Sequence, residues 1–302
     1  MEKILIVGGT GLLGFHLAKY YSKKKNFKII SLSRKKPKQT RKIQDVRYIY
    51  CDIAKKNKLF DILKKHKNIK YVINFGGEVE HKKLKKTFSS HYYGLKNLIE
   101  FFMQKDIKKF IQIGSSLEYG NYRSPQKEIN LLKPKSNYSK AKAYSSKFLI
   151  NLYKRLDFPI IIVRPYQVFG PYQDLNRLIP FVINSCLNNK KFACSNGLQF
   201  RDFLYVDDFT NSITSLLKKN LKGQIFNVGL GKAIQIKKII KLIQKQLKKG
   251  TPEFGKIKLR SDENLITYPD ISKIRKMIKW KPKTTFLSGL NKTINFYKRH
   301  KI

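Results

Sequence analysis

The segment ILIVGGTGLLG, residues 4–14, decides the fold of this 302-residue chain. An apolar, strand-like run leads directly into glycines at positions 8, 11 and 14, and a helical pattern begins at Leu12. Glycines at this spacing let the backbone approach a pyrophosphate closely, and the first helical turn offers N–H groups and a positive dipole end. An ordinary tight turn does not need three such glycines. The segment therefore predicts a dinucleotide-binding loop made of Gly8, Thr10, Gly11, Leu12, Leu13 and Gly14.

Strand-like and helix-like segments alternate through the first half of the chain. Short apolar runs predict strands at 3–7, 28–32, 46–50, 71–75, 109–114 and 159–163. Helical periodicity covers 12–24, 58–66, 87–104 and 138–156. Continuous apolar strands separated by helices are typical of a parallel sheet that is covered on both faces. We therefore predict an α/β, doubly wound sheet of the Rossmann type.

The regular alternation of strands and helices ends after Pro165, where prolines and glycines separate shorter predicted helices and strands. We interpret this half as a smaller C-terminal lobe that binds the substrate. The predicted cofactor-binding domain covers residues 1–168, and residues 202–229 return to it. Residues 169–201 and 230–302 are expected to form the substrate-binding lobe.

The end of the second predicted strand indicates which dinucleotide the chain prefers. An NAD-binding protein usually has a carboxylate here, which accepts a hydrogen bond from the ribose 2′-hydroxyl. This chain has Ser33 followed by Arg34, and a hydroxyl beside a guanidinium suits a 2′-phosphate. Arg34 can also be one more solvated base, but the missing acid favours NADP(H) over NAD(H).

Further cofactor contacts are predicted near the ends of later strands. Asp52 and Ile53 follow the third strand, where a carboxylate can meet the adenine amino group. Capping of the next helix explains Asp52 equally well. The remaining residues that we assign to the cofactor site are Phe75, Gly76 and Pro165.

The chain has an unusually high positive charge. Its 65 lysines and arginines stand against 19 acidic residues, which gives a formal net charge of +46. Such a balance is typical of proteins that bind nucleic acids or anionic membranes. Lysine supplies 54 of the 65 basic residues, spread along the whole chain without a nucleic-acid-binding motif. We therefore interpret the charge as a compositional bias and expect neither nucleic acid nor membrane as a partner.

Several other classes of protein do not fit the sequence. The longest apolar stretches, such as residues 158–163, are much shorter than the about 20 residues of a membrane helix. The N-terminus enters the first strand directly and fits no signal or transit peptide. Three cysteines, Cys51, Cys186 and Cys194, show no metal-binding spacing and are too few for a disulfide framework. We expect no metal and a cytoplasmic location.

A tyrosine, a lysine and a serine have the spacing of a proton-transfer site. Tyr138 and Lys142 lie four residues apart in a predicted helix, and therefore on one face. A fixed ammonium favours the phenolate form of the tyrosine, so the phenol can exchange a proton near neutral pH. Lys142 can also hold the nicotinamide ribose. Ser115 follows the fifth strand, at the edge where such sheets bind ligands, and its hydroxyl can hydrogen-bond a reacting oxygen.

These motifs resemble those of the extended short-chain dehydrogenases/reductases of the NAD(P)-dependent epimerase/dehydratase group, which act on nucleotide sugars. The resemblance covers essentially the whole chain. Besides the residues above, it depends on RPYQVFGP at 164–171, NRLIP at 176–180, GLQFRDFLYVDD at 197–208, FNVGLG at 226–231, RSD at 260–262 and WKP at 280–282. Within the group, the chain is most similar to the CDP-abequose and CDP-paratose synthases.

The resemblance implies an NADPH-dependent reduction of the C4 ketone of a nucleotide-linked 4-keto-6-deoxy or 3,6-dideoxy sugar. Such reductions belong to the synthesis of surface polysaccharides, including lipopolysaccharide. Tyr138 would supply the proton, Ser115 would polarise the oxygen and Lys142 would set the acidity of the tyrosine. The alternatives are a nucleotide-sugar 4-epimerase with tightly bound NAD and a non-catalytic NADP-binding regulator, which would not need these three residues.

The resemblance also implies the substrate contacts. Arg201 and Arg260 match the diphosphate-binding arginines of the family, and Arg177 is a weaker match. A structural salt bridge, for instance from Arg201 to Asp202 or Asp207, is the alternative. The other residues assigned to the nucleotide-diphosphate sugar are Ser116 and Gln167.

A homodimer is a further expectation from the resemblance. Extended relatives pair the helices expected at 87–104 and 138–156 into a four-helix bundle around a twofold axis. Both helices have apolar residues on more than one face, including Phe101, Phe102, Phe148 and Leu152. Burial by the protein's own C-terminal segments is the alternative explanation of these residues.

Departures from the family pattern narrow the reaction. The 4,6-dehydratases follow their catalytic hydroxyl with an Asp-Glu pair that eliminates water, whereas Ser116 and Leu117 follow Ser115 here. Dehydration is therefore not expected. His91 replaces a customary asparagine, and we interpret it as packed rather than as a substrate contact. Glu118 is the main rival of Tyr138 as proton donor.

Overall fold

The computed structural model describes residues 1–77, 84–259 and 263–300, and the chain divides into two compact units. The first unit comprises Met1–Gly120, Glu128–Pro165 and Thr210–Phe226. The second comprises Asn121–Lys127, Tyr166–Phe209 and Asn227–Ile302.

These units differ in detail from the domain boundaries that the sequence suggested. The return to the first unit begins at Thr210 rather than at residue 202. The physical reason is that strand β9, Phe200–Tyr205, pairs with strands of the second unit. The short segment Asn121–Lys127 also belongs to the second unit, where Gln126 pairs with Pro269.

A seven-stranded parallel sheet forms the centre of the first unit, with the order β10-β6-β5-β4-β1-β2-β3. Its strands are β1 Glu2–Val7, β2 Phe27–Ser33, β3 Val46–Tyr50, β4 Ile69–Asn74, β5 Lys109–Ile113, β6 Ile160–Pro165 and β10 Gln224–Val228. The chain winds outward from β1 in both directions, so the strand order reverses between β1 and β4. Ligands of such sheets bind at this point, outside the carboxyl ends of the strands. The predicted α/β, Rossmann-type fold is confirmed.

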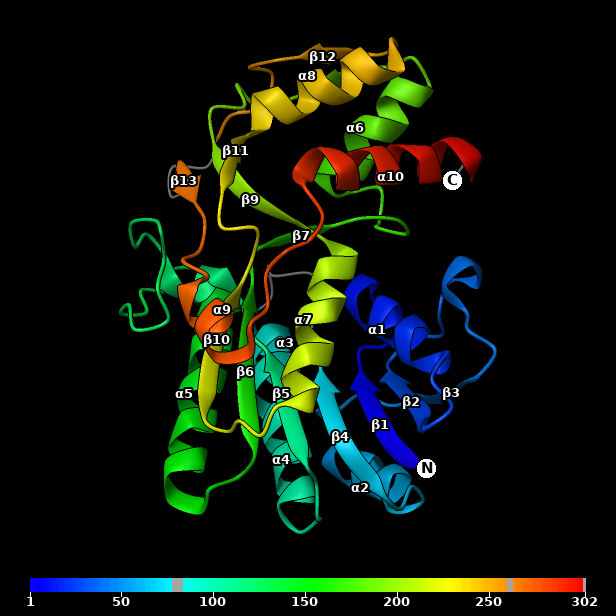
Figure 1. The fold of residues 1–302 in the computed structure, drawn as a ribbon, viewed down its shortest axis with the longest axis vertical. Coiled ribbons are helices and arrows are strands. Elements are labelled where there is room, and N and C mark those ends of the chain that lie inside the picture. Colours follow the sequence, from blue (N-terminus) through cyan, green and yellow to red (C-terminus); the bar gives the residue numbers. More distant parts are fainter. Residues whose placement is uncertain (78–83, 260–262, 301–302) are drawn as a thin grey trace. The chain divides into compact units, whose positions relative to one another are not determined.

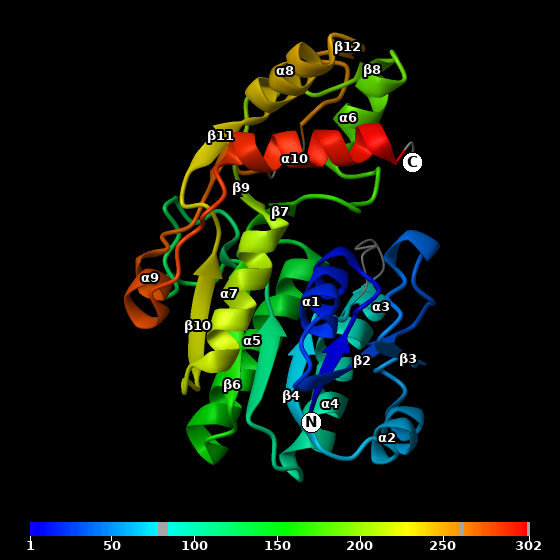
Figure 2. The same cartoon turned by 45° about the vertical axis from the view of Figure 1, so that its right-hand side comes forward.

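Helices cover both faces of this sheet. They are α1 Leu12–Ser22, α2 Lys56–Lys64, α3 Leu84–Phe88, α4 Gly94–Met103, α5 Asn137–Leu156 and α7 Val206–Lys218. Figures 1 and 2 both show α1 and α7 on one face, with α2, α4 and α5 on the other. No helix within the described ranges is both long enough and apolar enough to cross a bilayer.

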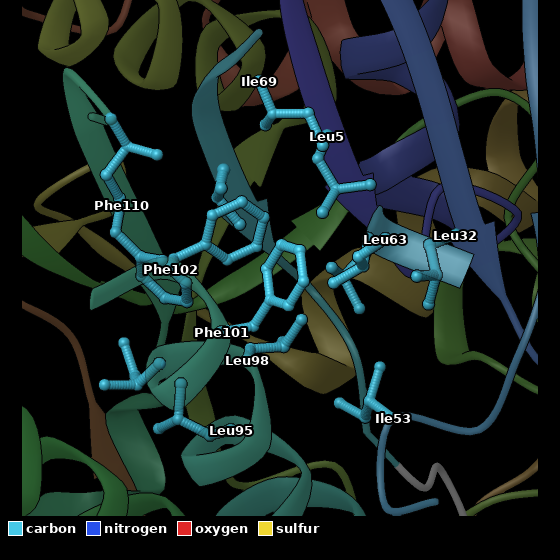
Figure 3. Packing of buried hydrophobic residues seen from close by; sticks show 14 of the residues in the cluster. Leu5, Leu32, Ile53, Leu63, Ile69, Leu95, Leu98, Phe101, Phe102 and Phe110 are labelled. Atoms are coloured by element: carbon cyan, nitrogen blue, oxygen red, sulfur yellow. The ribbon is translucent and has the colours of Figure 1, made fainter. Parts of the chain in front are cut away.

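The inner strands are mostly apolar because helices cover both faces of the sheet there. Leu5 and Leu32, from β1 and β2, lie in one cluster with Leu63 of α2 and with Leu98 and Phe102 of α4 (Figure 3). All five side chains are at most 1% exposed. The cluster packs α2 and α4 against the strands whose ends line the cavity described below.

The helix predicted at 87–104 is interrupted. α3 and α4 are separated by a π-helical turn, η2, at Ser89–Tyr93. A π turn inserts an extra residue into a helix and often occurs at functional sites. Here α4 begins at Gly94, where an added Cβ would lie 2.5 Å from Ile53, so the helix passes very close to the loop after β3.

The second unit contains shorter strands and four helices among its described residues. A four-stranded sheet combines β7 Gln167–Phe169, β9 Phe200–Tyr205, β11 Ala233–Gln235 and β13 Ile266–Thr267. A second ladder pairs β8 Lys191–Ala193 with β12 Thr251–Glu253. The helices are α6 Leu178–Leu187, α8 Ile236–Leu247, α9 Ser272–Ile278 and α10 Phe286–Arg299. Apolar residues of α6, α8 and α10 form one core with Phe203 and Tyr205 of β9.

Candidate functional site

A cavity of about 230 Å³ lies at the carboxyl ends of neighbouring strands in the first unit. Its lining comes from the ends of β1 and β2 and from the loops that follow β1, β2, β3 and β4. Predicted cofactor residues in this lining are Gly8, Thr10, Gly11, Ser33, Arg34, Asp52, Ile53, Phe75 and Gly76. Residues that lie up to 83 positions apart in sequence, from Val7 to Ser90, thus line one cavity at the switch point of the sheet.

The glycine loop has the shape that a dinucleotide requires. Gly8 has a φ of +78°, which favours glycine, and an added Cβ would lie 3.0 Å from the Phe75 carbonyl carbon. At Gly14 an added Cβ would lie 2.4 Å from the Gly8 oxygen, so α1 packs directly on the loop. Gly11 is different, because only the Gly8 oxygen, at 3.4 Å, lies near its Cβ position. Gly11 therefore leaves space beside the start of α1, where the helix dipole favours a pyrophosphate.

This difference predicts opposite effects of two glycine replacements. Gly11→Val is expected to weaken dinucleotide binding at least about tenfold, because the side chain fills space that the ligand needs and meets little protein. Its unfolding temperature should stay close to that of the wild type. Gly14→Ala should instead lower the unfolding temperature, because its Cβ collides with backbone. Calorimetric titration and thermal unfolding of both variants test this, and full affinity in a folded Gly11→Val would contradict it.

Positive charge lies at the end of the cavity formed by β2. The backbone N–H of Thr10 donates to the Ser33 Oγ at 3.3 Å, so the hydroxyl joins the glycine loop to the strand end. Arg34 and Lys35 follow and line the cavity with exposed side chains. Arg41 approaches from a short helix, η1 at Gln39–Arg41, and its Nη1 donates to the Thr10 carbonyl at 3.3 Å.

The contact of Arg41 with the glycine loop is not predictable from the sequence. Arg41 is only 4% exposed, although it stands in a strongly basic segment, residues 34–42, where nothing in the spacing distinguishes one base from another. The short helix η1, which follows β2, brings the Arg41 guanidinium to the Thr10 carbonyl of the glycine loop.

Asp52 fits both interpretations that the sequence offered. One carboxylate oxygen accepts a hydrogen bond from the Ala54 N–H at 3.0 Å, which shapes the turn before α2. The residue also lines the cavity, so its other oxygen can face a ligand. The predicted cofactor residues that are outside the described lining are Leu12, Leu13, Gly14, Tyr138, Lys142 and Pro165.

The helix α5 brings Tyr138 and Lys142 together. It begins after Ser136, whose Oγ accepts the Ser139 N–H at 3.2 Å and caps the helix. Tyr138 lies in the first turn and Lys142 one turn later, with the Lys142 Nζ 5.8 Å from the centre of the Tyr138 ring. The two residues therefore lie on one face of the helix, as their spacing predicts.

Lys142 is buried and joins α5 to the end of β5. Its side chain is 3% exposed, and its Nζ donates to the Ile113 carbonyl at 2.7 Å. Burial lowers the pKa of Lys142 to about 8, and the nearby charge of Glu118 opposes this shift. The ammonium form therefore predominates near pH 7, where it can act on the neighbouring phenol.

The Tyr138 ring packs edge-on against His91 of the π turn. The ring centres are 5.0 Å apart and the planes make an angle of 81°. His91 is 4% exposed and lies over Gly77, where an added Cβ would be 1.8 Å from the imidazole. The interruption of the predicted helix thus puts His91 between the Gly77 loop and the tyrosine.

Ser115 follows β5 and begins a short helix, η3 at Ser116–Tyr119. Its Oγ accepts the Leu117 N–H at 3.2 Å, and the Glu118 carboxylate accepts the Ser115 N–H at 2.8 Å. This reciprocal capping fixes the turn. Because the hydroxyl acts as acceptor in the cap, its hydrogen can point to a ligand oxygen. Ser116, predicted to contact substrate, is 8% exposed in the same turn.

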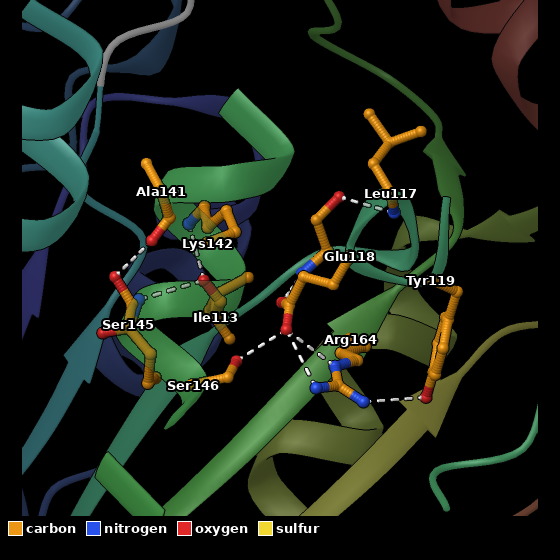
Figure 4. Close-up of polar contacts among 11 residues, drawn as sticks. Ile113, Leu117, Glu118, Tyr119, Ala141, Lys142, Ser145, Ser146 and Arg164 are labelled. Atoms are coloured by element: carbon orange, nitrogen blue, oxygen red, sulfur yellow. Dashed lines mark hydrogen bonds and ion pairs between the residues drawn. The ribbon is translucent and has the colours of Figure 1, made fainter. Parts of the chain in front are cut away.

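Glu118 acts as an acceptor, and the proposed rival role of proton donor does not fit it. The Glu118 Oε2 accepts from the Ser146 hydroxyl at 2.7 Å and from the Arg164 Nε at 3.0 Å (Figure 4). It also pairs with Arg164 Nη2 at 2.9 Å, with both side chains at most 1% exposed. Arg164, another residue that sequence reasoning missed as a site residue, further donates to the Tyr119 hydroxyl at 3.0 Å.

The predicted substrate residues outside the first unit lie on the second. Gln167 is an exposed residue of β7, and Arg177 is exposed at the start of α6. Arg201, on β9, pairs with Glu263 at 2.7 Å and donates to the Phe200 and Leu265 carbonyls. Arg260 is outside the described residues.

Asp202, one of the two suggested partners of Arg201, has a different role. Its carboxylate accepts the backbone N–H groups of Leu230, Gly231 and Lys232 at 2.6–3.1 Å. Burial nevertheless raises its pKa to about 6. The residue therefore ties β9 to the loop after β10 within the second unit.

Known proteins share this fold along the whole chain. Human dTDP-D-glucose 4,6-dehydratase is 26% identical over 322 residues, which cover 99% of this chain and 91% of that protein. The structure of Bacillus anthracis dTDP-glucose 4,6-dehydratase with NAD has a TM-score of 0.90 at 23% identity, covering 100% and 98% of the two chains. UDP-glucose 4-epimerase from Thermotoga maritima with UDP-glucose has a TM-score of 0.91 at 19% identity, covering 99% and 100%. The sequence pattern of one family matches residues 4–229, so the chain belongs to the NAD dependent epimerase/dehydratase family.

Proposed function

We propose that this enzyme reduces the C4 ketone of a nucleotide-linked 4-keto-6-deoxy or 3,6-dideoxy sugar with NADPH. The observation that supports this most strongly is the position of Lys142. Its buried ammonium is bonded to the end of β5, two residues before Ser115, and lies one helical turn from Tyr138. A charged lysine, a phenol and a hydroxyl are thereby concentrated where β5 ends, beside a cavity suited to a dinucleotide.

The family and its relatives support a nucleotide sugar as the substrate class. The human relative is named for dTDP-D-glucose, and the Thermotoga maritima structure contains UDP-glucose. A nucleoside diphosphate needs planar, charge-assisted donors, for which Arg177, Arg201 and Arg260 are the candidates. Arg201 would exchange its pairing with Glu263 for one with a phosphate, or share both.

The residues of the first unit divide the reduction between them. NADPH, when bound in the loop of Gly8, Gly11 and Gly14, supplies the hydride that C4 receives. Tyr138 donates its phenolic proton to the sugar oxygen as the carbon–oxygen double bond is reduced to an alcohol. Ser115 donates a hydrogen bond to the same oxygen and stabilises the developing negative charge. The ammonium of Lys142 stabilises the phenolate that Tyr138 leaves behind.

Loss of water, the reaction for which the human relative is named, is not proposed for this chain. Elimination requires an acid and a base next to the catalytic hydroxyl, and Ser116 and Leu117 stand there. The nearest carboxylate, Glu118, accepts bonds from Arg164, Ser146 and the Ser115 N–H. In all of these contacts Glu118 is the hydrogen-bond acceptor.

The preference for NADP(H) is supported by the end of β2. Ser33 and Arg34 line the cavity where an acid would bind the ribose 2′-hydroxyl of NAD. Lys35 adds a second positive charge to the lining of the cavity. Arg41 donates a hydrogen bond to the Thr10 carbonyl of the glycine loop. These groups suit a 2′-phosphate better than a hydroxyl.

Arg34→Ala is expected to narrow the difference in affinity between NADPH and NADH by about tenfold, the value of one charge-assisted hydrogen bond. NADH binding should change little. The matched control is Lys36→Ala, which removes a neighbouring exposed charge outside the described lining of the cavity. Calorimetric titration measures the ratio of NADPH affinity to NADH affinity in the wild type and in both variants. Tighter binding of NADH than of NADPH by the wild type would contradict the preference.

The main alternative is a 4-epimerase that oxidises C4 and returns the hydride to the opposite face. It is the reaction for which the Thermotoga maritima structure is named. An epimerase must retain its dinucleotide through the cycle, whereas a reductase exchanges it. Purified protein that retains one equivalent of NAD would favour the epimerase, and protein that binds and releases NADPH would favour the reductase. A non-catalytic regulator would bind NADP without turnover.

A panel of CDP-, dTDP- and GDP-linked 4-keto-6-deoxy sugars tests the proposal. With NADPH present, at least one member should be reduced, with consumption of one NADPH for each alcohol formed. Products are identified by NMR, which also gives the base, the sugar and the configuration at C4. The reductase proposal would be wrong if the protein reduced none of these ketones. Interconversion of UDP-sugars without net consumption of NADPH would then identify the protein as an epimerase.

The homodimer is proposed through the outer surface of α5 and the π turn. A groove of about 490 Å³ is lined there by Tyr92, Tyr144, Phe148, Leu152 and Leu156, with Lys147, Asn151 and Arg155. Tyr144 and Leu156 are 56% and 58% exposed, and contiguous apolar side chains of this kind often mark a protein–protein contact. Phe101 and Phe102, which the sequence suggested for this face, instead pack in the core of the first unit.

Sedimentation at micromolar concentration is expected to give a dimer for the wild type and a monomer for Leu156→Glu, because a carboxylate would be buried in the apolar contact. Leu131→Glu is the matched control, since Leu131 is 72% exposed on a loop away from this groove. A wild type that sediments only as a monomer would contradict the dimer.

A further inference from the structure

The buried carboxylate of Glu118 joins three elements of the first unit. One oxygen accepts the backbone N–H of Ser115 at 2.8 Å, at the end of β5. The other accepts the Ser146 hydroxyl of α5 at 2.7 Å and two nitrogens of Arg164, from β6, at 2.9 and 3.0 Å (Figure 4). These elements include the two that hold the proposed catalytic residues, because Ser115 follows β5 and α5 contains Tyr138 and Lys142.

The connection is fully desolvated. Glu118 and Arg164 are 0% and 1% exposed, and Ser146 is 2% exposed. Each oxygen of the carboxylate is matched by at least one donor, and the guanidinium also reaches the Tyr119 hydroxyl. An ion pair buried in this way is often no more stabilising than apolar side chains of the same volume. Stabilisation of the fold therefore does not by itself explain why the Glu118–Arg164 ion pair lies next to Ser115.

We infer that Glu118 is a positioning residue, anchored by Arg164, which holds Ser115 against α5 in the geometry that the reduction requires. This inference rests on the proposed function for its activity readout. Glu118 gives no proton and touches no ligand in this role. It fixes the backbone of Ser115 on one side and the middle of α5 on the other, since Ser146 lies one turn beyond Lys142.

Glu118 has a second effect through its charge. Its negative charge raises the pKa of Lys142, against the lowering caused by burial. Among the described residues, Arg164, Tyr119, Tyr138 and His91 are titratable or charged groups that contact Glu118, Lys142 or their direct partners. Arg164 is bonded to Glu118 itself, so the carboxylate is the group whose charge supports the ammonium.

The decisive variant is the double replacement Glu118→Gln with Arg164→Met. Glu118→Gln alone leaves a buried guanidinium without its counter-charge and can fail to fold. The double variant removes both charges while the glutamine oxygen can still accept one N–H. It should unfold near the wild-type temperature and bind NADPH normally. Its kcat should nevertheless fall about 10²-fold, the effect of a misplaced catalytic group, and the alkaline limb of its pH–rate profile should move to lower pH.

Ser146→Ala tests the link to α5 without disturbing the ion pair. We expect about a tenfold loss of kcat and an unchanged affinity for NADPH, because a single hydrogen bond is removed. The matched control is Ser145→Ala. Ser145 is equally buried on the same helix, but its hydroxyl donates to the Ala141 and His91 carbonyls and not to Glu118. Its kcat should stay within about twofold of the wild type.

Hydrogen exchange separates this inference from the proposed function, because it needs no turnover. The double variant should exchange the backbone amides of residues 114–120 several-fold faster than the wild type, with NADPH present in both. Faster exchange in a protein that reduces none of the keto sugars would uphold the positioning and overturn the proposed function. An active wild type, with a double variant that matches it in kcat, pH limb and exchange, would overturn the positioning.

Discussion

Tyr138→Phe should lower kcat by about 10²–10⁴-fold, the usual scale of general acid catalysis. The variant loses the phenolic proton and almost no volume, so the packing of the ring against His91 is kept. The affinity for NADPH should barely change, because the phenol acts on the sugar oxygen. The rate of reduction in a single turnover and the dissociation constant of NADPH together measure this separation.

The control for this replacement is on the same helix. Tyr144→Phe removes a phenolic hydroxyl from a ring that is 56% exposed on the outer surface of α5. Its turnover should equal that of the wild type. Near-normal turnover of Tyr138→Phe would remove the acid role from Tyr138.

Lys142→Ala should damage both turnover and cofactor binding. The variant loses the charge that stabilises the phenolate of Tyr138, for which we expect a decrease in kcat of about 10²–10³-fold. It also loses a donor to the nicotinamide ribose, so NADPH should bind about tenfold more weakly. If the variant binds NADPH normally and only its kcat is reduced, Lys142 sets the acidity of Tyr138 and does not bind the ribose.

The pH dependence gives a second test of Lys142. Burial lowers the pKa of this lysine to about 8, so its ammonium form is complete well below pH 8 and is lost as the pH rises through that value. The rate of ketone reduction should therefore fall above about pH 8 in the wild type. An ordinary exposed lysine would keep its charge to about pH 10. In Lys142→Ala this decrease in rate above about pH 8 should be absent. If the decrease is unchanged in the variant, it arises from the titration of another group.

The fold was predictable from the sequence because local pattern and global architecture agree. The apolar run at 4–7 is buried on both faces in β1, and the glycines after it leave only the backbone path that the turn to α1 requires. The predicted strands and helices shift by one or two residues at most ends, as is normal where helices fray. The break at Ser89–Tyr93 was not predictable, because a π turn keeps the apolar spacing of a helix on either side.

The site was predictable where one motif or one strand end supplies the residue. Gly8, Ser33 and Asp52 come directly from strand ends, and the topology brings such ends together. Arg41 was not predictable, since it reaches the loop from a separate short helix within a basic segment. The contact of Glu118 with Arg164 was not predictable, because the two residues are 46 positions apart and only the pairing of β5 with β6 brings them together.

The transfer of deuterium from 4-deuterated NADPH to the sugar tests the central claim most directly. The enzyme is incubated with the labelled cofactor and the keto sugar nucleotide that it uses, and the product is examined by NMR. A reductase should place one deuterium at C4 for each NADPH consumed, with a single configuration at that carbon. An unchanged keto sugar with no NADPH consumed and no deuterium transferred, from a protein that interconverts the C4 epimers of a UDP-sugar, would contradict the reduction proposed here.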